Sequence, residues 1–226
     1  MSEQMSNVKI SRSEQTQKRI IYNFLDLINT KKWDKITVKE ICQKTDITRG
    51  TFYQYFTNTE ELMEELQNEL LEDLTKRYRR LPNPLPAAYP IERFNEKFDY
   101  NAPERLYCWF AFCKRHKHKM QVLLNEKNGD IEFIKKLKDI LNAEINIMMD
   151  ADGMPYDEYR TQFIKVFLDL HFMTARNWLD SDSEYSLQTN EIIHILNTMR
   201  IGGNYLTYRE HITPNFKAKA YFPEEE

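Results

Sequence analysis

Hydrophobic residues in the first part of the chain recur every three or four positions, which is the spacing of an amphipathic helix. This pattern starts at Ser11 or Ser13 and ends near Lys32, where lysine charges favour a helix C-terminus. Its apolar face consists of Ile20, Ile21, Phe24, Leu25, Leu27 and Ile28. Residues 1–10 have no such periodicity and are expected to be disordered.

Two short helices are predicted next. Thr37 and Glu40 have the spacing of a capping box, in which each side chain accepts a hydrogen bond from a backbone N–H at the start of the helix. This helix is expected to stop at 45–47. Thr48 is then placed to cap a third helix that runs over about 49–55. Two short helices joined by a tight turn are typical of a helix-turn-helix.

A fourth helix is predicted over 58–80, starting with a possible capping box of Asn58 and Glu61. Its buried positions are Leu62, Leu66, Leu70 and Leu74. Four prolines then fall within nine residues, 82–90, and this stretch is the best candidate for a joint between domains.

Further helices are predicted after the joint. They begin at Pro103, Asp130 and Pro155, and the last spans Leu187 to Ile201 and halts at the glycine pair 202–203. The expected inward positions of the first two are Leu106, Trp109, Phe110 and Cys113, then Ile131, Ile134, Leu137, Leu141, Ile145 and Met148. The fold class is therefore all-α, and residues 207–226 are expected to form a partly frayed tail.

Charge is distributed unevenly along the chain. Residues 8–59 contain ten Lys or Arg and five Asp or Glu, a net charge of +5, so the total of −3 leaves −8 for the rest. A basic N-terminal part suits a protein that contacts an anion at one end. No apolar run is long enough for a membrane span or a signal peptide, and the three cysteines lack paired spacing, so a reduced cytoplasmic protein is expected.

The predicted helix-turn-helix has the chemistry needed to contact DNA. The second helix of such a motif enters the major groove, where hydroxyl, amide and guanidinium groups bond to base edges and phosphates. Gly50 lets the backbone approach closely, while Phe52 and Phe56 are expected to face inward. Backbone N–H groups at the starts of the second and third helices are expected to point at phosphates.

The stretch ITVKEICQKTDITRGTFYQYFTNTEEL resembles the DNA-binding segment of TetR-type transcriptional regulators, and the resemblance covers about 12–71. It implies an all-α homodimer with a three-helix DNA-binding domain at 11–58 and a helical domain for effector binding and dimerisation at 59–206. It also implies phosphate contacts by Thr37, Thr48, Tyr53 and Tyr55, and base contacts by Arg49, Gly50, Thr51 and Gln54. The family commonly has Lys where this chain has Thr59, so a phosphate contact there is weakened or made by the hydroxyl.

Two further sets of residues follow from the predicted helices of the larger domain. An apolar or aromatic effector is expected among Trp109, Phe112, Cys113, Phe133, Met148, His171, Phe172 and Met173, although such stripes are more often plain core. The resemblance implies a four-helix dimer seam formed by Phe163, Phe167, Leu170, Trp178, Ile192, Ile195 and Met199.

Other chemistry has weaker support. Cys113 and His116 share a possible helix face, but His118 points away and no second cluster completes a metal site, so no metal or cofactor is expected. No nucleophile, paired-His or phosphate-loop pattern indicates an enzyme. The leading hypothesis is a repressor released from its operator by an effector. The alternative is an adaptor or coactivator that uses the same fold to contact a protein partner.

Overall fold

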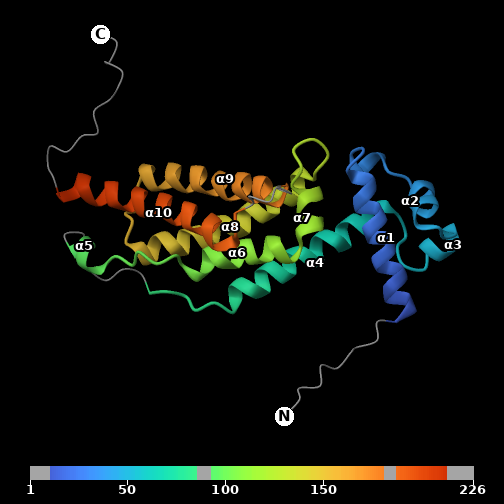
Figure 1. Ribbon diagram of the computed structural model, residues 1–226, viewed down its shortest axis with the longest axis horizontal. Helices are drawn as coiled ribbons and strands as arrows, with labels where there is room; N and C mark the ends of the chain where they lie inside the picture. The colour runs from blue at the N-terminus through green and yellow to red at the C-terminus, as the bar shows by residue number, and fades with distance from the viewer. Residues whose placement is uncertain (1–10, 86–92, 181–186, 213–226) are drawn as a thin grey trace, which may run out of the picture. The chain divides into compact units, whose positions relative to one another are not determined.

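The computed structural model describes residues 11–85, 93–180 and 187–212, and within these ranges all regular structure is helical (Figure 1). The predicted all-α fold is therefore confirmed. The expected disorder of 1–10 lies outside the described residues, as does most of the proline-rich joint. Among the described helices, none combines the length and the apolar character that a bilayer span requires.

The chain divides into two compact units. The first comprises residues 1–73 and 118–135, and the second comprises 74–117 and 136–226. The return of 118–135 to the first unit is a tertiary feature that hydrophobic periodicity does not reveal.

The first unit begins with a helix that is capped as the sequence suggests. Ser11 and Glu14 form a complete capping box, in which the Glu14 N–H donates to Ser11 Oγ at 3.1 Å and the Ser11 N–H donates to Glu14 Oε2 at 2.8 Å. The helices in its N-terminal part are α1 (Arg12–Ile28), the 3₁₀ turn η1 (Trp33–Lys35), α2 (Val38–Thr45), α3 (Arg49–Phe52) and the first part of α4 (Thr59–Arg79).

The predicted end of the first helix near Lys32 is wrong, because α1 stops at Ile28. The N–H groups of Thr30 and Lys31 both donate to the Leu27 carbonyl, so the chain tightens there. The Lys31 ammonium instead forms an ion pair with Glu40 of α2 at 2.6 Å. The lysine charge therefore joins the loop after α1 to α2 rather than ending a helix.

The second unit is built mainly from long helices. Its elements are α5 (Phe94–Lys97), α6 (Glu104–Arg115), most of α8 (Ile131–Asp152), α9 (Glu158–Asp180) and α10 (Thr189–Ile212), while α7 (Lys117–Leu123) lies almost entirely in the first unit. Helices α9 and α10 lie side by side and both contact α6 (Figure 1). Asp130 caps α8 as predicted, since its Oδ1 accepts the Phe133 N–H at 2.7 Å.

The prediction that Ile131 belongs to the buried face of α8 is wrong. Ile131 is 77% exposed, whereas Leu137, Leu141, Ile145 and Met148 are buried. Ile131 is the first residue of the helix, and Phe133 takes the buried position in that turn instead.

The glycine pair does not end the last helix, and that prediction is also wrong. Helix α10 continues through Gly202 and Gly203 to Ile212, so the first residues of the predicted tail are helical. A Cβ at Gly203 would lie 2.4 Å from Cε2 of Phe163, while one at Gly202 would meet nothing within 4 Å. Gly203 therefore allows α10 to approach α9 closely, which is a packing role rather than a stop signal.

Candidate nucleic-acid interface

The turn between α2 and α3 is held by a residue in the left-handed conformation. Asp46 has φ 57° and ψ 55°, and its N–H bonds back to the Cys42 and Gln43 carbonyls. Aspartate tolerates this conformation better than most residues. Helix α2 therefore ends abruptly, as predicted for 45–47, and α3 begins after only Ile47 and Thr48.

Helix α3 is capped by Thr48, as the sequence predicts. Thr48 Oγ1 accepts the Thr51 N–H at 3.1 Å and also lies 3.0 Å from Thr51 Oγ1. The α-helical part is shorter than the predicted 49–55 and closes with tighter bonds, including Tyr55 N–H to the Phe52 carbonyl at 2.9 Å. The segment is thus one capped turn of α-helix followed by a tight turn.

Two buried rings fix this segment on its domain. Phe52 and Phe56 are almost completely buried, with ring centroids 5.8 Å apart, which confirms their predicted inward orientation. Tyr53 packs edge-on against Phe52 but remains 55% exposed. Because the segment is anchored on one side, its other side chains are directed to solvent.

The exposed side presents polar groups that the fold does not use. Across the part of the chain that the structure describes, the Arg49 guanidinium and the Gln54 amide form no hydrogen bond or ion pair, and both residues are exposed. A Cβ at Gly50 would contact only Thr48 Oγ1, at 3.7 Å. Intramolecular packing therefore does not require glycine at 50.

Thr37 and Thr59, which the resemblance placed at phosphates, are engaged within the protein. Thr37 Oγ1 accepts the Glu40 N–H at 3.3 Å and the Thr37 N–H donates to Glu40 Oε2 at 2.9 Å, which is the predicted capping box. Thr37 Oγ1 also donates to Glu40 Oε2 at 2.8 Å. Thr59 is only 9% exposed and donates to Glu60 at 3.1 Å. Thr59 is therefore poorly placed to replace the family's lysine, whereas Tyr55 is half-buried and keeps part of its surface accessible.

An ion pair and a hydrogen bond join α1 to α2. Lys44 pairs with Asp26 at 2.5 Å, and Arg19 donates to the Thr45 carbonyl at 2.6 Å. Hydrogen bonds from Lys31 and Thr37 lower the pKa of Glu40 to about 2. Glu40 is therefore ionised at neutral pH and serves both the capping box and the ion pair with Lys31, which follows α1.

A segment distant in the sequence completes this unit. His118 of α7 stacks on Tyr22 of α1 with ring centroids 4.8 Å apart, and Lys119 pairs with Glu69 at 2.6 Å. The Asn128 amide donates to the Asn29 carbonyl at 3.3 Å. The sequence contains no local signal for these contacts, because each joins residues separated by at least 50 positions.

Comparison with known proteins decides the type of this domain. Residues 25–66 match the sequence model of the family described as bacterial regulatory proteins, tetR family. The N-terminal domain is of the TetR type. The matched stretch includes the whole of α2, the turn and α3, so the exposed polar segment lies within the TetR-type domain.

A stretch of 56 residues is 41% identical to the HTH-type dhaKLM operon transcriptional activator DhaS of Lactococcus lactis subsp. lactis. That stretch is 25% of this chain and spans only 30% of the activator. Two solved structures extend the likeness in fold: a TetR transcriptional regulator from Streptococcus agalactiae (TM-score 0.53, 17% identity, 83% of this chain and 94% of that one) and the fatty acid degradation regulator FadR from Bacillus halodurans (0.52, 16%, 83% and 95%). At such identities these structures show a shared fold.

Of the predicted effector residues, Trp109 packs against both Phe112 and Phe172, with ring centroids 6.1 and 5.2 Å apart. Trp109, Phe112 and Cys113 are fully buried, and the Trp109 indole donates to the His171 carbonyl at 3.4 Å. Phe133 belongs to the first unit, and Met173 is 44% exposed. Met148 alone of the predicted set lines the cavity described below. The buried rings therefore serve as core in this structure.

His171 illustrates how that core is satisfied. Its Nδ1 donates to the Phe167 carbonyl at 2.6 Å, and its ring packs edge-on against Phe167. Burial lowers the pKa of His171 to about 4, so the ring is neutral at pH 7. Burial likewise raises the pKa of the Cys113 thiol. Neither group carries charge that would attract an ionic ligand.

The predicted dimer residues separate into buried and exposed groups. Phe167 and Ile192 are buried within the unit, Trp178 donates to the Leu187 carbonyl at 2.8 Å, and Ile195 and Met199 are each 42% exposed. Phe163 and Leu170 are half-buried. The hydrophobic pattern of the sequence did not reveal an exposed apolar row on α9 at seven-residue spacing, which consists of Tyr159, Val166 and Met173.

Proposed function

We propose that the chain is a homodimeric, sequence-specific DNA-binding regulator of transcription, with no enzymatic activity. The observation that carries the proposal is the exposed segment after Thr48, in which the side chains of Arg49 and Gln54 form no hydrogen bond or ion pair with any other described residue. These side chains have the groups that pair with guanine and adenine edges in the major groove. The segment is held rigidly by buried rings, which favours a fixed register on the duplex.

The surrounding charge supports an anionic partner. Residues 8–59 carry a net +5, although the whole chain carries −3. Electrostatic attraction to phosphate is independent of sequence and weakens steeply with salt. On this proposal Thr48, Tyr53 and Tyr55 contact the backbone, while Arg49, Gly50, Thr51 and Gln54 approach bases.

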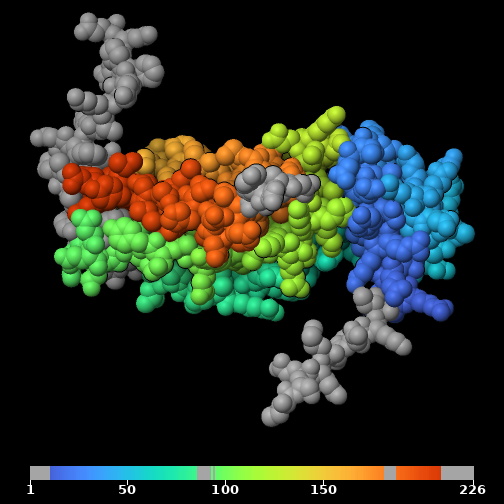
Figure 2. All heavy atoms as spheres, viewed as in Figure 1, coloured from blue at the N-terminus to red at the C-terminus, as the bar shows by residue number. Residues whose placement is uncertain are grey.

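Exposed apolar side chains on α9 and α10 support the proposed dimer. Figure 2 shows one face of the second unit on which both helices reach the surface along much of their length. On α9 the row includes Val166, which is 61% exposed, and on α10 it includes Ile195, Met199 and Leu206. An isologous pairing of these helices would bury that surface and repeat the DNA-binding segment about a two-fold axis.

We propose further that the bound dimer represses transcription and that a small molecule releases it by binding better to a conformation that misfits DNA. DhaS, which is similar over 56 residues, is named as an activator. Whether this chain represses or activates transcription therefore has to be measured directly. Reporter transcription from the chain's own promoter should fall when the protein is added. An increase in reporter transcription would show that the protein is an activator, and it would not contradict operator binding.

Operator binding itself is tested by selection of random duplexes followed by fluorescence anisotropy. The proposal predicts an enriched, near-palindromic site whose affinity falls steeply as salt rises. Enrichment of no sequence, together with capture of a stable protein partner, would favour the adaptor alternative.

A further inference from the structure

The second unit contains a cavity of about 240 Å³ between the end of α4, the start of α6 and the C-terminal part of α8. Its walls are partly apolar and include Leu81, Pro103, Met148 and Ala151. Charged groups from four segments also line it, namely Asp99, Glu104, Arg105, Asp152 and Arg200. The cavity therefore combines an apolar wall with a dense set of charges.

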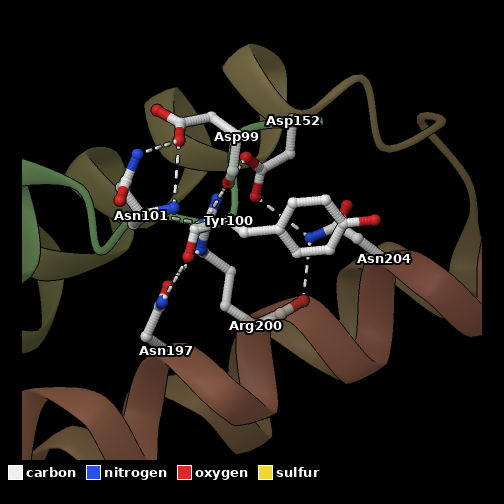
Figure 3. Close-up of polar contacts among 7 residues, drawn as sticks. All are labelled: Asp99, Tyr100, Asn101, Asp152, Asn197, Arg200 and Asn204. Carbon is white, nitrogen blue, oxygen red and sulfur yellow. Dashed lines mark hydrogen bonds and ion pairs between the residues drawn. The ribbon is translucent and has the colours of Figure 1, made fainter. Parts of the chain in front are cut away.

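The guanidinium of the first arginine at the cavity, Arg200, is hydrogen-bonded within the protein through all three of its nitrogens. Arg200 is 1% exposed; its Nη1 pairs with Asp152 at 2.5 Å, and its Nε donates to Asn197 at 2.9 Å. Its Nη2 donates to the carbonyls of Asp99 and Asn101, at 2.7 and 2.9 Å (Figure 3). The guanidinium therefore fastens segment 99–101 to α10 and has little capacity left for an added anion.

The second arginine is committed in the same way. Arg105 is 5% exposed and forms an ion pair with Glu144, and its Nη2 donates to the Pro82 carbonyl at 3.2 Å and to Asn83 at 2.8 Å. Glu144, Met148 and Asp152 are spaced four apart on α8. One helix face thus supplies both carboxylates that neutralise the two arginines, with an apolar residue between them.

Two carboxylates at the cavity are not neutralised. Within the described ranges Glu104 has no ion pair or hydrogen bond, and Asp99 Oδ1 bonds only to the Asn101 backbone and amide. Both residues are exposed at the rim. With each arginine paired, the charge left over at the cavity is negative, and the chain outside the basic N-terminal part is also acidic.

We propose that this cavity binds a small organic cation, with its charged end at Glu104 and Asp99. The apolar part of the molecule lies against Met148 and Pro103. The volume is below the roughly 300–1,000 Å³ of cavities for drug-sized ligands, so the ligand is small. An anion is disfavoured because both guanidinium groups already have carboxylate partners.

Calorimetric titration of the full-length chain tests this with three probes of equal length: hexylamine, 1-hexanol and hexanoate, at pH 7.5 and low salt. The amine should bind most tightly and hexanoate least. Glu104→Gln should weaken amine binding roughly tenfold, the factor expected for a hydrogen bond to a charged group, and leave hexanol unchanged. Added salt should weaken only the amine.

Glu132→Gln is the matched control, because Glu132 is also an exposed glutamate in the first turn of a helix but lies in the first unit. It should leave amine affinity unchanged. Equal affinity for all three probes, no binding of the amine, tightest binding of hexanoate, or equal losses in the two variants would each overturn the proposal. The titration uses no DNA, so its failure would leave the proposed operator binding standing.

Discussion

Single residues determine how closely helices of the second unit approach each other. Gly203→Ala places a methyl group against the Phe163 ring, at 2.4 Å from Cε2. Overpacking of this kind lowers the free energy of unfolding by about 1–3 kcal/mol. The higher helix propensity of alanine offsets about 1 kcal/mol of this loss. We expect a net loss in the free energy of unfolding, measured by urea denaturation.

The same substitution in a Phe163→Leu background separates this clash from a general effect of removing glycine. Leucine lacks the Cε2 and Cζ atoms that the new methyl group would meet, so Gly203→Ala should cost much less there. An equal cost in both backgrounds would show that ring contact is not the reason for glycine at 203.

Asp152 gives a residue-scale prediction about pH. Burial raises its pKa to about 6, outweighing the lowering by Arg200 and Asn204. Since the folded pKa lies above the ordinary value of 3.8, the stability from protonation is fully present below pH 4 and is lost as pH rises through 6. The difference in free energy of unfolding between wild type and Asp152→Asn should fall by about 2 kcal/mol from pH 4 to pH 7. A difference that grows with pH would contradict this.

At the scale of elements, the C-terminal extension of α10 should stabilise the second unit. Asn204 donates to Asp152 at 3.0 Å, and Tyr208 packs with Phe98. A chain ending at Ile201 loses both contacts and should unfold at a clearly lower temperature by circular dichroism. A chain ending at Ile212 is the control and should match the full-length protein. Equal stability of the two truncated chains would contradict the role given to 202–212.

Helix starts that depend on a local cap could be predicted from sequence better than the ends of α1 and α10. The boxes and caps at Thr37, Thr48 and Asp130 are local, since each depends on a residue three positions away. The ends of α1 and α10 depend on partners elsewhere, namely Glu40 for Lys31 and Phe163 for Gly203. The exposed side of the candidate interface was predictable because it depends on local caps. The cavity was not, because its walls come from segments far apart in the sequence.

At the scale of the whole molecule, the proposed dimer depends on the exposed rows of α9 and α10. Val166→Asp and Met199→Asp should each convert the dimer into monomer in light scattering after size exclusion, because a buried unpaired charge is costly. Ile131→Asp is the control, since Ile131 is more exposed than either but lies outside the rows. If both variants remained dimeric, the dimer interface would have to lie on another surface of the protein.

The most direct test of the account compares affinities for the selected operator and for a scrambled duplex by fluorescence anisotropy at two salt concentrations. Wild type should prefer the operator, and its binding should weaken with salt. Arg49→Ala should lose about 1–3 kcal/mol of that preference, whereas Tyr53→Phe should weaken both duplexes evenly. Equal affinity of the wild-type protein for both duplexes, or an Arg49→Ala variant as selective as wild type, would contradict the claim that the segment after Thr48 reads DNA sequence.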